Sequence, residues 1–294
     1  MKPSHVVLHV TDIMTTKYCE DLAVYLNRQD ENIAVDIVES KQQIQDISDR
    51  YSCIVISADR EICSMAYSMN IPFIPVVDSE NSGTFFENAL YVMEMAPCID
   101  INSIYRIYQR YKNIPWTICE TKRMVIREQT VDDVCDLYEI YDDPEVIRFT
   151  ESLYEDRDEE IKYMKDYIDK QYRFFEYGIW ALVDKKTQKL IGRAGISDRE
   201  GYSISEIGYV IRKEYRNKGY AGEALNAILS YAAEELNMNE MQAFTLPENA
   251  AGIHLLKSLK FTKVGEDIIM NKLHDRYYLK PEDFINSTKD SDQR

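Results

Sequence analysis

Hydrophobic and polar positions follow two periods along the first third of the chain. Short apolar, β-branched runs predict buried strands at 5–10, 33–38, 53–57 and 73–77. Between them, apolar residues recur every three or four positions over 15–28, which predicts an amphipathic helix, and Ala58-Asp59 begins another that extends to about Met69. Strands that alternate with helices in this way indicate a parallel sheet covered on both faces, a Rossmann-like α/β domain.

The pattern changes after a helix predicted over 101–112. Pro115 cannot continue a helix, so we place a domain boundary near Trp116. Past a strand at 124–128, Thr130 fits a helix N-cap, and a second helix covers about 157–176. Three further strand candidates separated by turn-like segments predict an antiparallel meander: 178–184, 189–197 and 203–211. The last predicted elements are helices at 221–236 and 249–259 and strands at 242–246, 261–265 and 276–280.

These elements define the expected domain organisation. The first domain spans 1–116, the second spans 120–282, and a polar tail covers 283–294. The first domain has neither a G-x-G-x-x-G nor a G-x-x-x-x-G-K motif after any strand, so it lacks a phosphate-binding fingerprint.

Composition narrows the class of protein. The 294 residues are 45% hydrophobic and 29% charged, which is typical of a soluble globular chain. With 35 Lys+Arg against 51 Asp+Glu, the formal charge is −16. This charge argues against nucleic acid and against an anionic membrane surface as partners, because both require a basic footprint. The acidity keeps a cytosolic protein soluble or steers a cationic partner, and both interpretations stay open.

Several features predict a cytoplasmic protein without a metal. No run of about 18 apolar residues exists, and the first residues show no signal-peptide pattern. The cysteines form no C-x-x-C pair, so we expect them to be reduced and buried: Cys19, Cys53, Cys63, Cys98, Cys119 and Cys135. The histidines show no metal-ligand spacing: His5, His9, His254 and His274.

The most informative segment runs from a predicted strand into an amphipathic helix over 207–236. Gly219 and Gly222 leave backbone N–H groups accessible just where the helix begins. The N-terminus of a helix favours an anion, so the turn predicts a pyrophosphate site. A locally basic patch strengthens this hypothesis: Arg212, Lys213, Arg216 and Lys218. The simpler alternative is a glycine-rich turn that only caps the helix.

The pattern R-x-x-G-x-A, preceded by the strand sequence E-I-G-Y, resembles the Gcn5-related N-acetyltransferase (GNAT) superfamily, and within it the ribosomal-protein N-acetyltransferase branch. Residues 191–195 resemble the middle strand of its meander. Residues 248–251, followed by 255–261, resemble its second motif. The resemblance covers about 120–282 and implies a mixed, largely antiparallel sheet flanked by helices.

The resemblance also implies acetyl-CoA as the acyl donor, bound where the strands at 203–211 and 242–246 splay apart. Its pantetheine would pair with the backbone of Tyr209, Val210 and Ile211. Its pyrophosphate would lie on the backbone of the loop Arg216, Asn217, Lys218, Gly219, Tyr220, Ala221 and Gly222. Asn249 matches a position that hydrogen-bonds the cofactor arm, and a helix N-cap explains the same residue equally well.

The implied reaction transfers an acetyl group to the primary amine of a protein N-terminus, a polyamine or a small molecule. A protonated amine is not nucleophilic, so a base must take its proton, and Glu206 is the candidate, against the alternative of an ordinary strand carboxylate. Leu256 stands where relatives carry a tyrosine acid; Tyr209, Tyr215, Tyr220 or water are the alternatives. The alternative function is a sensor that binds acetyl-CoA with little turnover.

A stretch rich in aromatic residues precedes the meander: Tyr163, Tyr167, Tyr172, Phe174, Phe175 and Tyr177. Aromatic faces can hold a cationic acceptor, and at helical spacing the same residues also fit a core. Trp180 on the following strand is expected in the core.

The first domain resembles, more weakly, a haloacid-dehalogenase-like domain. The phosphatases of that type need an early D-x-D motif, whereas Asp12 and Asp59 each stand alone here. We therefore expect a non-catalytic domain for binding, regulation or dimerisation. Phosphatase activity is the minor alternative.

Overall fold

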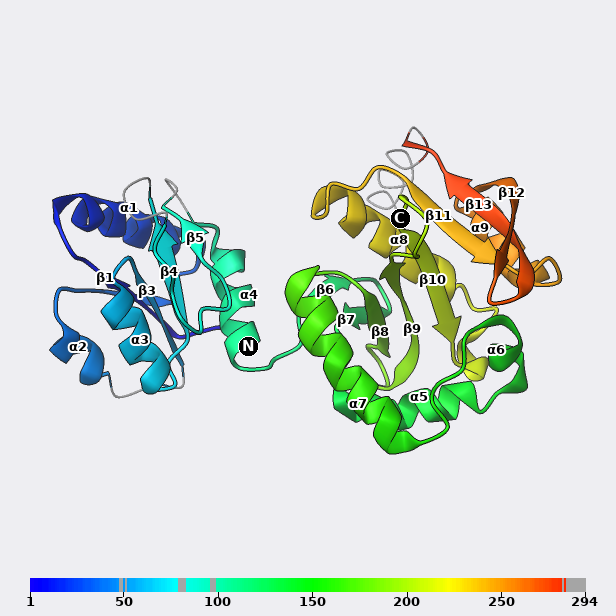
Figure 1. Ribbon diagram of the computed structural model, residues 1–294, viewed down its shortest axis with the longest axis horizontal. Helices are drawn as coiled ribbons and strands as arrows, with labels where there is room; N and C mark the ends of the chain where they lie inside the picture. The colour runs from blue at the N-terminus through cyan, green and yellow to red at the C-terminus, as the bar shows by residue number, and fades with distance from the viewer. Residues whose placement is uncertain (48–49, 51, 79–82, 96–98, 282, 284–294) are drawn as a thin grey trace. The chain divides into compact units, whose positions relative to one another are not determined.

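The computed structural model describes residues 1–47, 50, 52–78, 83–95, 99–281 and 283. The chain divides into two compact units, Met1–Trp116 and Thr117–Arg294 (Figure 1). Cys98 and, apart from Asp283, the predicted polar tail lie outside the described residues.

Unit 1 contains a parallel sheet in the order β2-β1-β3-β4-β5. Its strands are β1 His5–His9, β2 Ala34–Val38, β3 Cys53–Ser57, β4 Phe73–Val77 and β5 Met93–Glu94. Each neighbouring pair runs in the same direction, which confirms the predicted parallel sheet. The apolar runs predicted β1 to β4 to within a residue. β1, β3 and β4 are buried parallel strands, which are apolar on both faces, whereas β2 at the edge of the sheet is mostly exposed.

Helices cover both faces of this sheet. They are α1 Ile13–Gln29, α2 Lys41–Gln45, α3 Arg60–Ser68 and α4 Ile101–Tyr111. Leu8 of β1 lies in a hydrophobic cluster with residues of α1 and α4, whereas its neighbour Val7 lies in a cluster with residues of α2 and α3. Successive side chains of a strand point to opposite faces, so one strand supplies both clusters. The haloacid-dehalogenase-like and Rossmann-like assignments of this unit stay predictions.

The two isolated aspartates of unit 1 cap helices. Asp12 accepts a hydrogen bond from the Thr15 N–H at 2.9 Å at the start of α1. Asp59 accepts one from the Glu61 N–H at 2.7 Å at the start of α3. Each carboxylate satisfies a backbone donor that the first helical turn leaves without a partner. This role accounts for both residues without any phosphatase chemistry.

We expect unit 1 to lose stability as the pH falls below about 6.5, because its central strands bury a histidine. His9 at the end of β1 is 6% exposed, and its Nδ1 lies 3.1 Å from Ser57 Oγ. Burial lowers the pKa of His9 below its ordinary value of 6.5, while the charge of Asp59 partly opposes this. The unfolded chain therefore takes up a proton before the folded chain does, and stability present above this pH is lost below it.

Urea unfolding above and below pH 6.5 measures this effect. The chain has two tryptophans, Trp116 in unit 1 and Trp180 in unit 2, so a Trp180→Phe background leaves Trp116 fluorescence to report on unit 1. His9→Gln keeps a polar partner for Ser57 without the titration, and its stability should fall less steeply with acid. Identical pH dependence in both proteins would rule out His9 as the source.

Unit 2 is built on an eight-stranded sheet in the order β12-β13-β11-β10-β9-β8-β7-β6. Its strands are β6 Thr117–Glu120, β7 Met124–Arg127, β8 Ile179–Asp184, β9 Leu190–Ser197, β10 Glu206–Ile211, β11 Met241–Thr245, β12 Thr262–Ile269 and β13 Lys272–Leu279. Of the adjacent strand pairs in this sheet, only β10 and β11 run parallel, and the others run antiparallel. The predicted mixed, largely antiparallel sheet is confirmed.

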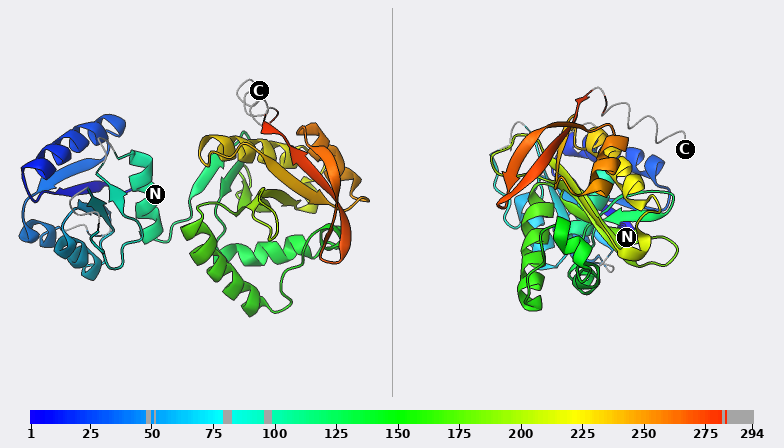
Figure 2. Two further views of the ribbon diagram at one scale, coloured as in Figure 1. Left: turned by 45° about the horizontal axis from the view of Figure 1, so that its top comes forward. Right: turned by 90° about the vertical axis from the view of Figure 1, so that its right-hand side faces the viewer.

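Helices again cover both faces of the sheet: α5 Val134–Tyr141, α6 Pro144–Phe149, α7 Arg157–Tyr167, α8 Tyr220–Glu234 and α9 Ala250–Ser258. Val210 of β10 lies in a cluster with residues of α5, α6 and α7. On the opposite face, the Trp180 ring meets Tyr231 of α8 edge to face at 5.6 Å. Figure 2 shows the green helices α5 and α7 on one side of this sheet. Trp180 is 0% exposed, which confirms it as a core residue.

Two of the described cysteines differ from expectation, since Cys119 on β6 is only partly buried. Cys19, Cys53 and Cys63 are buried as predicted, but Cys135 on α5 is exposed. It falls on the solvent side of the helix, whereas its neighbour Val134 packs against the sheet. Among the described residues, His, Cys, Asp and Glu side chains nowhere gather in a group of three that could hold a metal ion. The helices of that part of the chain are all too short or too polar to cross a membrane.

Candidate active site

The site is centred on a gap between the two parallel strands. The register joins β10 and β11 at a single pair, Glu206 and Gln242, and the Gln242 N–H donates to the Ser205 carbonyl at 3.0 Å. Beyond this pair the strands separate toward their carboxyl ends. The sheet therefore has an internal edge along β10, as the sequence predicts for a splayed pair.

Backbone alternation decides which groups face the gap. The Arg212 N–H donates to the Ile191 carbonyl at 2.7 Å on the β9 side, so the backbone of Val210 also belongs to that ladder. Tyr209 and Ile211 direct their backbone groups to the opposite side, into the gap. The register thus corrects the expectation for Val210, whose N–H and C=O are directed toward β9. Its neighbours Tyr209 and Ile211 are placed as expected.

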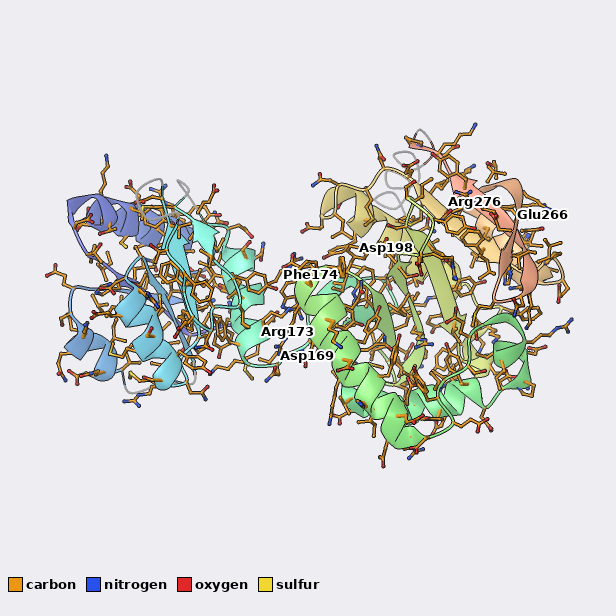
Figure 3. The ribbon with its side chains drawn as sticks, viewed as in Figure 1. Asp169, Arg173, Phe174, Asp198, Glu266 and Arg276 are labelled. Carbon is orange, nitrogen blue, oxygen red and sulfur yellow. The ribbon has the colours of Figure 1, made fainter. Side chains whose placement is uncertain are left out.

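A buried glutamine fixes the point where the strands separate. Gln242 is 0% exposed, and its Nε2 donates to the Ile204 carbonyl at 2.6 Å. Its Oε1 accepts from Arg276 Nε at 2.9 Å; Arg276 is labelled on β13 in Figure 3. A buried amide is stable only with its hydrogen bonds satisfied, so Gln242 joins β10, β11 and β13 at one place. Sequence reasoning missed this residue.

The predicted phosphate loop follows β10. Gly219 is the N-cap of α8 and has a left-handed φ of 80°, and Asn217 before it has a φ of 56°. The Glu223 N–H is the donor that reaches the Gly219 carbonyl at 3.1 Å. The N–H groups of Tyr220, Ala221 and Gly222 come before this first helical bond and are free to bind an anion. The loop therefore presents backbone donors where the sequence predicts a pyrophosphate.

The arginines of the basic patch have a different role from the one expected. Arg216 forms ion pairs with Asp143 at 2.8 Å and Glu145 at 2.9 Å, and its Nε donates to the Ile211 carbonyl at 2.9 Å. Arg212 pairs in the same way with acidic residues of α5, Asp136 and Glu139. Their charges are already neutralised, so they hold the loop against α5 and α6. Lys213 and Lys218 form no ion pair within the described part of the chain.

A third arginine, missed from the sequence, holds the loop from the other side. Arg123 Nε lies 2.6 Å from Glu223 Oε2, and its Nη1 donates to the Lys218 carbonyl at 2.8 Å. The guanidinium also lies over the Tyr220 ring, 4.0 Å from its centroid. Arg123 and the loop are about a hundred positions apart, so no local pattern indicates this contact.

Glu206, the candidate base, lies at the start of β10 where the gap opens. Its side chain is 13% exposed, and Oε2 accepts from Arg199 Nε at 2.6 Å. This pairing raises the pKa of Arg199. Oε1 forms no hydrogen bond to any described residue. Asp198, labelled in Figure 3 just after β9, accepts a hydrogen bond from Ser205 Oγ at 2.7 Å beside this pair.

The remaining predicted residues divide between capping and core roles. Asn249 caps α9, where its Oδ1 accepts from the Gly252 N–H at 2.9 Å. Leu256 is buried at 4% exposure, and its side chain has no ionisable group, so this position cannot supply an acid. Of the alternative tyrosines, Tyr220 donates to Asp184 Oδ2 at 3.2 Å and packs edge to face with Tyr215. Burial raises the pKa of Tyr209, which keeps its hydroxyl protonated near neutral pH.

The aromatic stretch divides into two groups. Tyr172 is fully buried, and the Tyr167 hydroxyl accepts from the Ile179 N–H at 2.8 Å. Tyr163 is 44% exposed, and Phe174, labelled in Figure 3, is 80% exposed. The first pair belongs to the core, and the second pair is open to solvent.

Comparisons with known proteins agree with this arrangement. Residues 123–262 match the family model described as the acetyltransferase (GNAT) domain. The chain is 30% identical over 146 residues to YnaD of Bacillus subtilis (strain 168), an uncharacterized N-acetyltransferase, across 49% of this chain and 82% of that protein. It is 29% identical over 147 residues to the uncharacterized N-acetyltransferase p20 of Bacillus licheniformis, with the same two coverages.

Among solved structures, an acetyltransferase of the GNAT family from Bacillus anthracis is 22% identical. It covers 55% of this chain and 98% of its own, with a TM-score of 0.47. The chain belongs to the GNAT family of acetyltransferases. It is an N-acetyltransferase, and unit 2 carries the matching domain, which confirms the family and the class of enzyme predicted from the sequence. The finer assignment to the ribosomal-protein branch stays a prediction.

Proposed function

We propose that unit 2 transfers the acetyl group of acetyl-CoA to a primary amine. The observation that carries this proposal is the internal sheet edge: after the pair Glu206 and Gln242, no described strand pairs with the gap side of β10 at Tyr209 and Ile211, beside a helix N-terminus. The Ile211 carbonyl already accepts from Arg216, so the Ile211 N–H and both backbone groups of Tyr209 are the available ones. An extended pantetheine arm can complete this edge as a strand would. The free N–H groups of the loop then lie where a pyrophosphate follows the arm.

The residues present fit acetyl-CoA. Tyr209 and Ile211 would bond the pantetheine amides, and residues 216–222 would hold the pyrophosphate through their backbone. Asn249 would reach the arm with its side-chain amide nitrogen, since its oxygen already caps α9. When bound, the cofactor supplies an acetyl thioester.

Glu206 would take the proton that the attacking amine must lose, directly or through one water on Oε1. A C–N bond forms, the C–S bond breaks, and the sulfur leaves with its electron pair. A thiol has a pKa of about 8.5, so water can protonate the departing sulfur without the tyrosine that Leu256 replaces. Tyr209, Tyr215 and Tyr220 are the protein alternatives, by proximity in sequence.

The test measures thiol release from acetyl-CoA with a panel of peptides, polyamines and small amines. Acetyl-amine product confirmed by mass spectrometry supports the proposal. One observation favours a second candidate, a sensor that binds the cofactor with little turnover: the buried Leu256 removes the usual acid. Stabilisation by acetyl-CoA without product from any amine would favour the sensor and contradict transfer.

For unit 1 we propose a non-catalytic role, because both of its isolated aspartates cap helices. Hydrolysis of para-nitrophenyl phosphate with Mg²⁺, abolished in Asp12→Asn, would contradict this.

A further inference from the structure

Arg193 in the middle of β9 has no use in the site described above. Its register partner across the ladder is Val210, so its side chain leaves the sheet on the same face as Glu206. Its Nε donates to the Tyr141 hydroxyl at 2.9 Å, and the guanidinium lies 4.8 Å from the centroid of that ring. Its charge also acts on the half-exposed Tyr163. Within the described residues it has no carboxylate at ion-pair distance.

This lack of a carboxylate contrasts with other arginines of the same unit. Five arginines of unit 2 are each matched with one or two acidic side chains: Arg123, Arg127, Arg199, Arg212 and Arg216. The half-buried Arg276, which forms no ion pair with a described residue, instead donates to the Gln242 amide oxygen. Holding a partly buried guanidinium without an anion is unfavourable, because burial removes part of its hydration. A chain with a formal charge of −16 has carboxylates in excess. Arg193 has only the neutral hydroxyl and ring of Tyr141 as its contacts, so its guanidinium can still take an anion.

Gly208 leaves an open position on β10 between Arg193 and Glu206, whereas the facing Gly195 is covered by the backbone of Gly178 and Ile179. Gly195 and Gly208 face each other in the register, between the pair Arg193–Val210 and the pair Ser197–Glu206. A methyl group added at Gly208 would find no heavy atom within 4 Å. Glu206 and Val210 lie four positions apart, about 13 Å along the strand. A molecule over Gly208 could present one group to the Glu206 side chain and another to the Arg193 side chain.

We propose that Arg193 binds a carboxylate of the acceptor, so that the preferred acceptor is a small primary amine carrying its own carboxylate, such as an amino acid. This inference rests on the proposed function. The planar guanidinium matches a carboxylate with two parallel hydrogen bonds. The amine then lies toward Glu206 and the gap. A polyamine brings only positive charge to Arg193, so it is the poorer acceptor.

The experiment compares acceptors that differ at the carboxyl group, glycine with glycinamide and β-alanine with β-alaninamide, each with saturating acetyl-CoA. Because amidation also lowers the pKa of the amine, kcat/KM is calculated for the free-amine form of each acceptor. We expect the wild type to favour the carboxylate member in kcat/KM by about 10- to 100-fold. Arg193→Gln should abolish that preference and leave the amides unchanged, and Arg193→Lys should restore part of it. Arg148→Gln, at an exposed arginine on α6, is the matched control and should behave as wild type.

The other outcomes of this experiment separate failure of the inference from failure of the proposed function. An equal loss for acids and amides in Arg193→Gln, or no preference in the wild type, would overturn the inference while acetyl transfer stands. If no amine is acetylated, calorimetry of the same pairs with CoA-saturated protein decides separately. If the wild type binds the carboxylate member more tightly and Arg193→Gln removes that difference, the inference stands although the proposed function fails. Equal binding of acid and amide overturns the inference.

Discussion

Glu206→Gln should lower kcat/KM for the best acceptor amine by about 10²- to 10⁴-fold, the range for loss of a general base. Glutamine keeps the size of the side chain and can still contact Arg199, but it cannot take a proton. Steady-state thiol release measured from neutral to alkaline pH checks this. The remaining activity should depend on pH only because the fraction of unprotonated acceptor amine changes with pH. Acetyl-CoA affinity should stay near the wild-type value, because the backbone of Tyr209 and Ile211 is intact.

Glu200→Gln is the matched control for this prediction. Glu200 is an exposed carboxylate beside Arg199 in the chain, and its loss should leave kcat/KM unchanged. Thermal unfolding of both variants separates chemistry from stability, since Arg199 loses its charged partner only in Glu206→Gln. A Glu206→Gln enzyme with wild-type kcat/KM at every pH would remove Glu206 from the mechanism.

Gly219→Val should weaken acetyl-CoA binding by at least about tenfold. The φ of 80° at this N-cap is left-handed, and a side chain there costs about 1–2 kcal/mol or more when β-branched. The backbone would leave this conformation, and the N–H groups of the following turn would no longer converge on one point. Calorimetric titration with acetyl-CoA measures the affinity. In a Trp116→Phe background, Trp180 fluorescence during unfolding measures the stability of unit 2.

Gly201→Val separates backbone strain from loss of the phosphate loop. Gly201 has a φ of 87° and, like Gly219, no atom near enough to clash, but it lies in the turn before β10. Both variants should lose similar stability, and only Gly219→Val should lose cofactor affinity. Equal affinities in the two variants would show that the pyrophosphate does not rest on this loop.

Individual strands and helices of both units could be predicted because short stretches of sequence determine them. The apolar runs of β1, β3 and β4 and the glycine at the start of α8 are legible in sequence. β6 was missed because Thr117–Glu120 is short and begins two residues after Pro115, where the domain boundary was expected. The closing strands β12 and β13 were underestimated because β12 is almost wholly exposed and lacks an apolar face.

Partners across the fold could not be predicted. The sequence placed Arg216 in a phosphate loop, but nothing in it indicates that Asp143 and Glu145, more than seventy positions earlier, neutralise its charge. Gln242 and Arg193 look like ordinary strand residues. Their significance comes from what surrounds them: three satisfied hydrogen bonds for one, and the lack of a carboxylate among the described residues for the other.

The ion pairs that neutralise Arg212 and Arg216 have a consequence for ionic strength. A cofactor held by oriented backbone N–H groups is attracted at short range, where dissolved salt screens little. Binding of acetyl-CoA at the Gly219 turn should therefore change little with salt. The same pairing leaves no row of free guanidinium groups along the loop for the repeating phosphates of a long polyanion. Under the proposed function, a single pyrophosphate would still fit the turn, where the backbone N–H groups and the lysines without an ion pair in the described chain, Lys213 and Lys218, remain available.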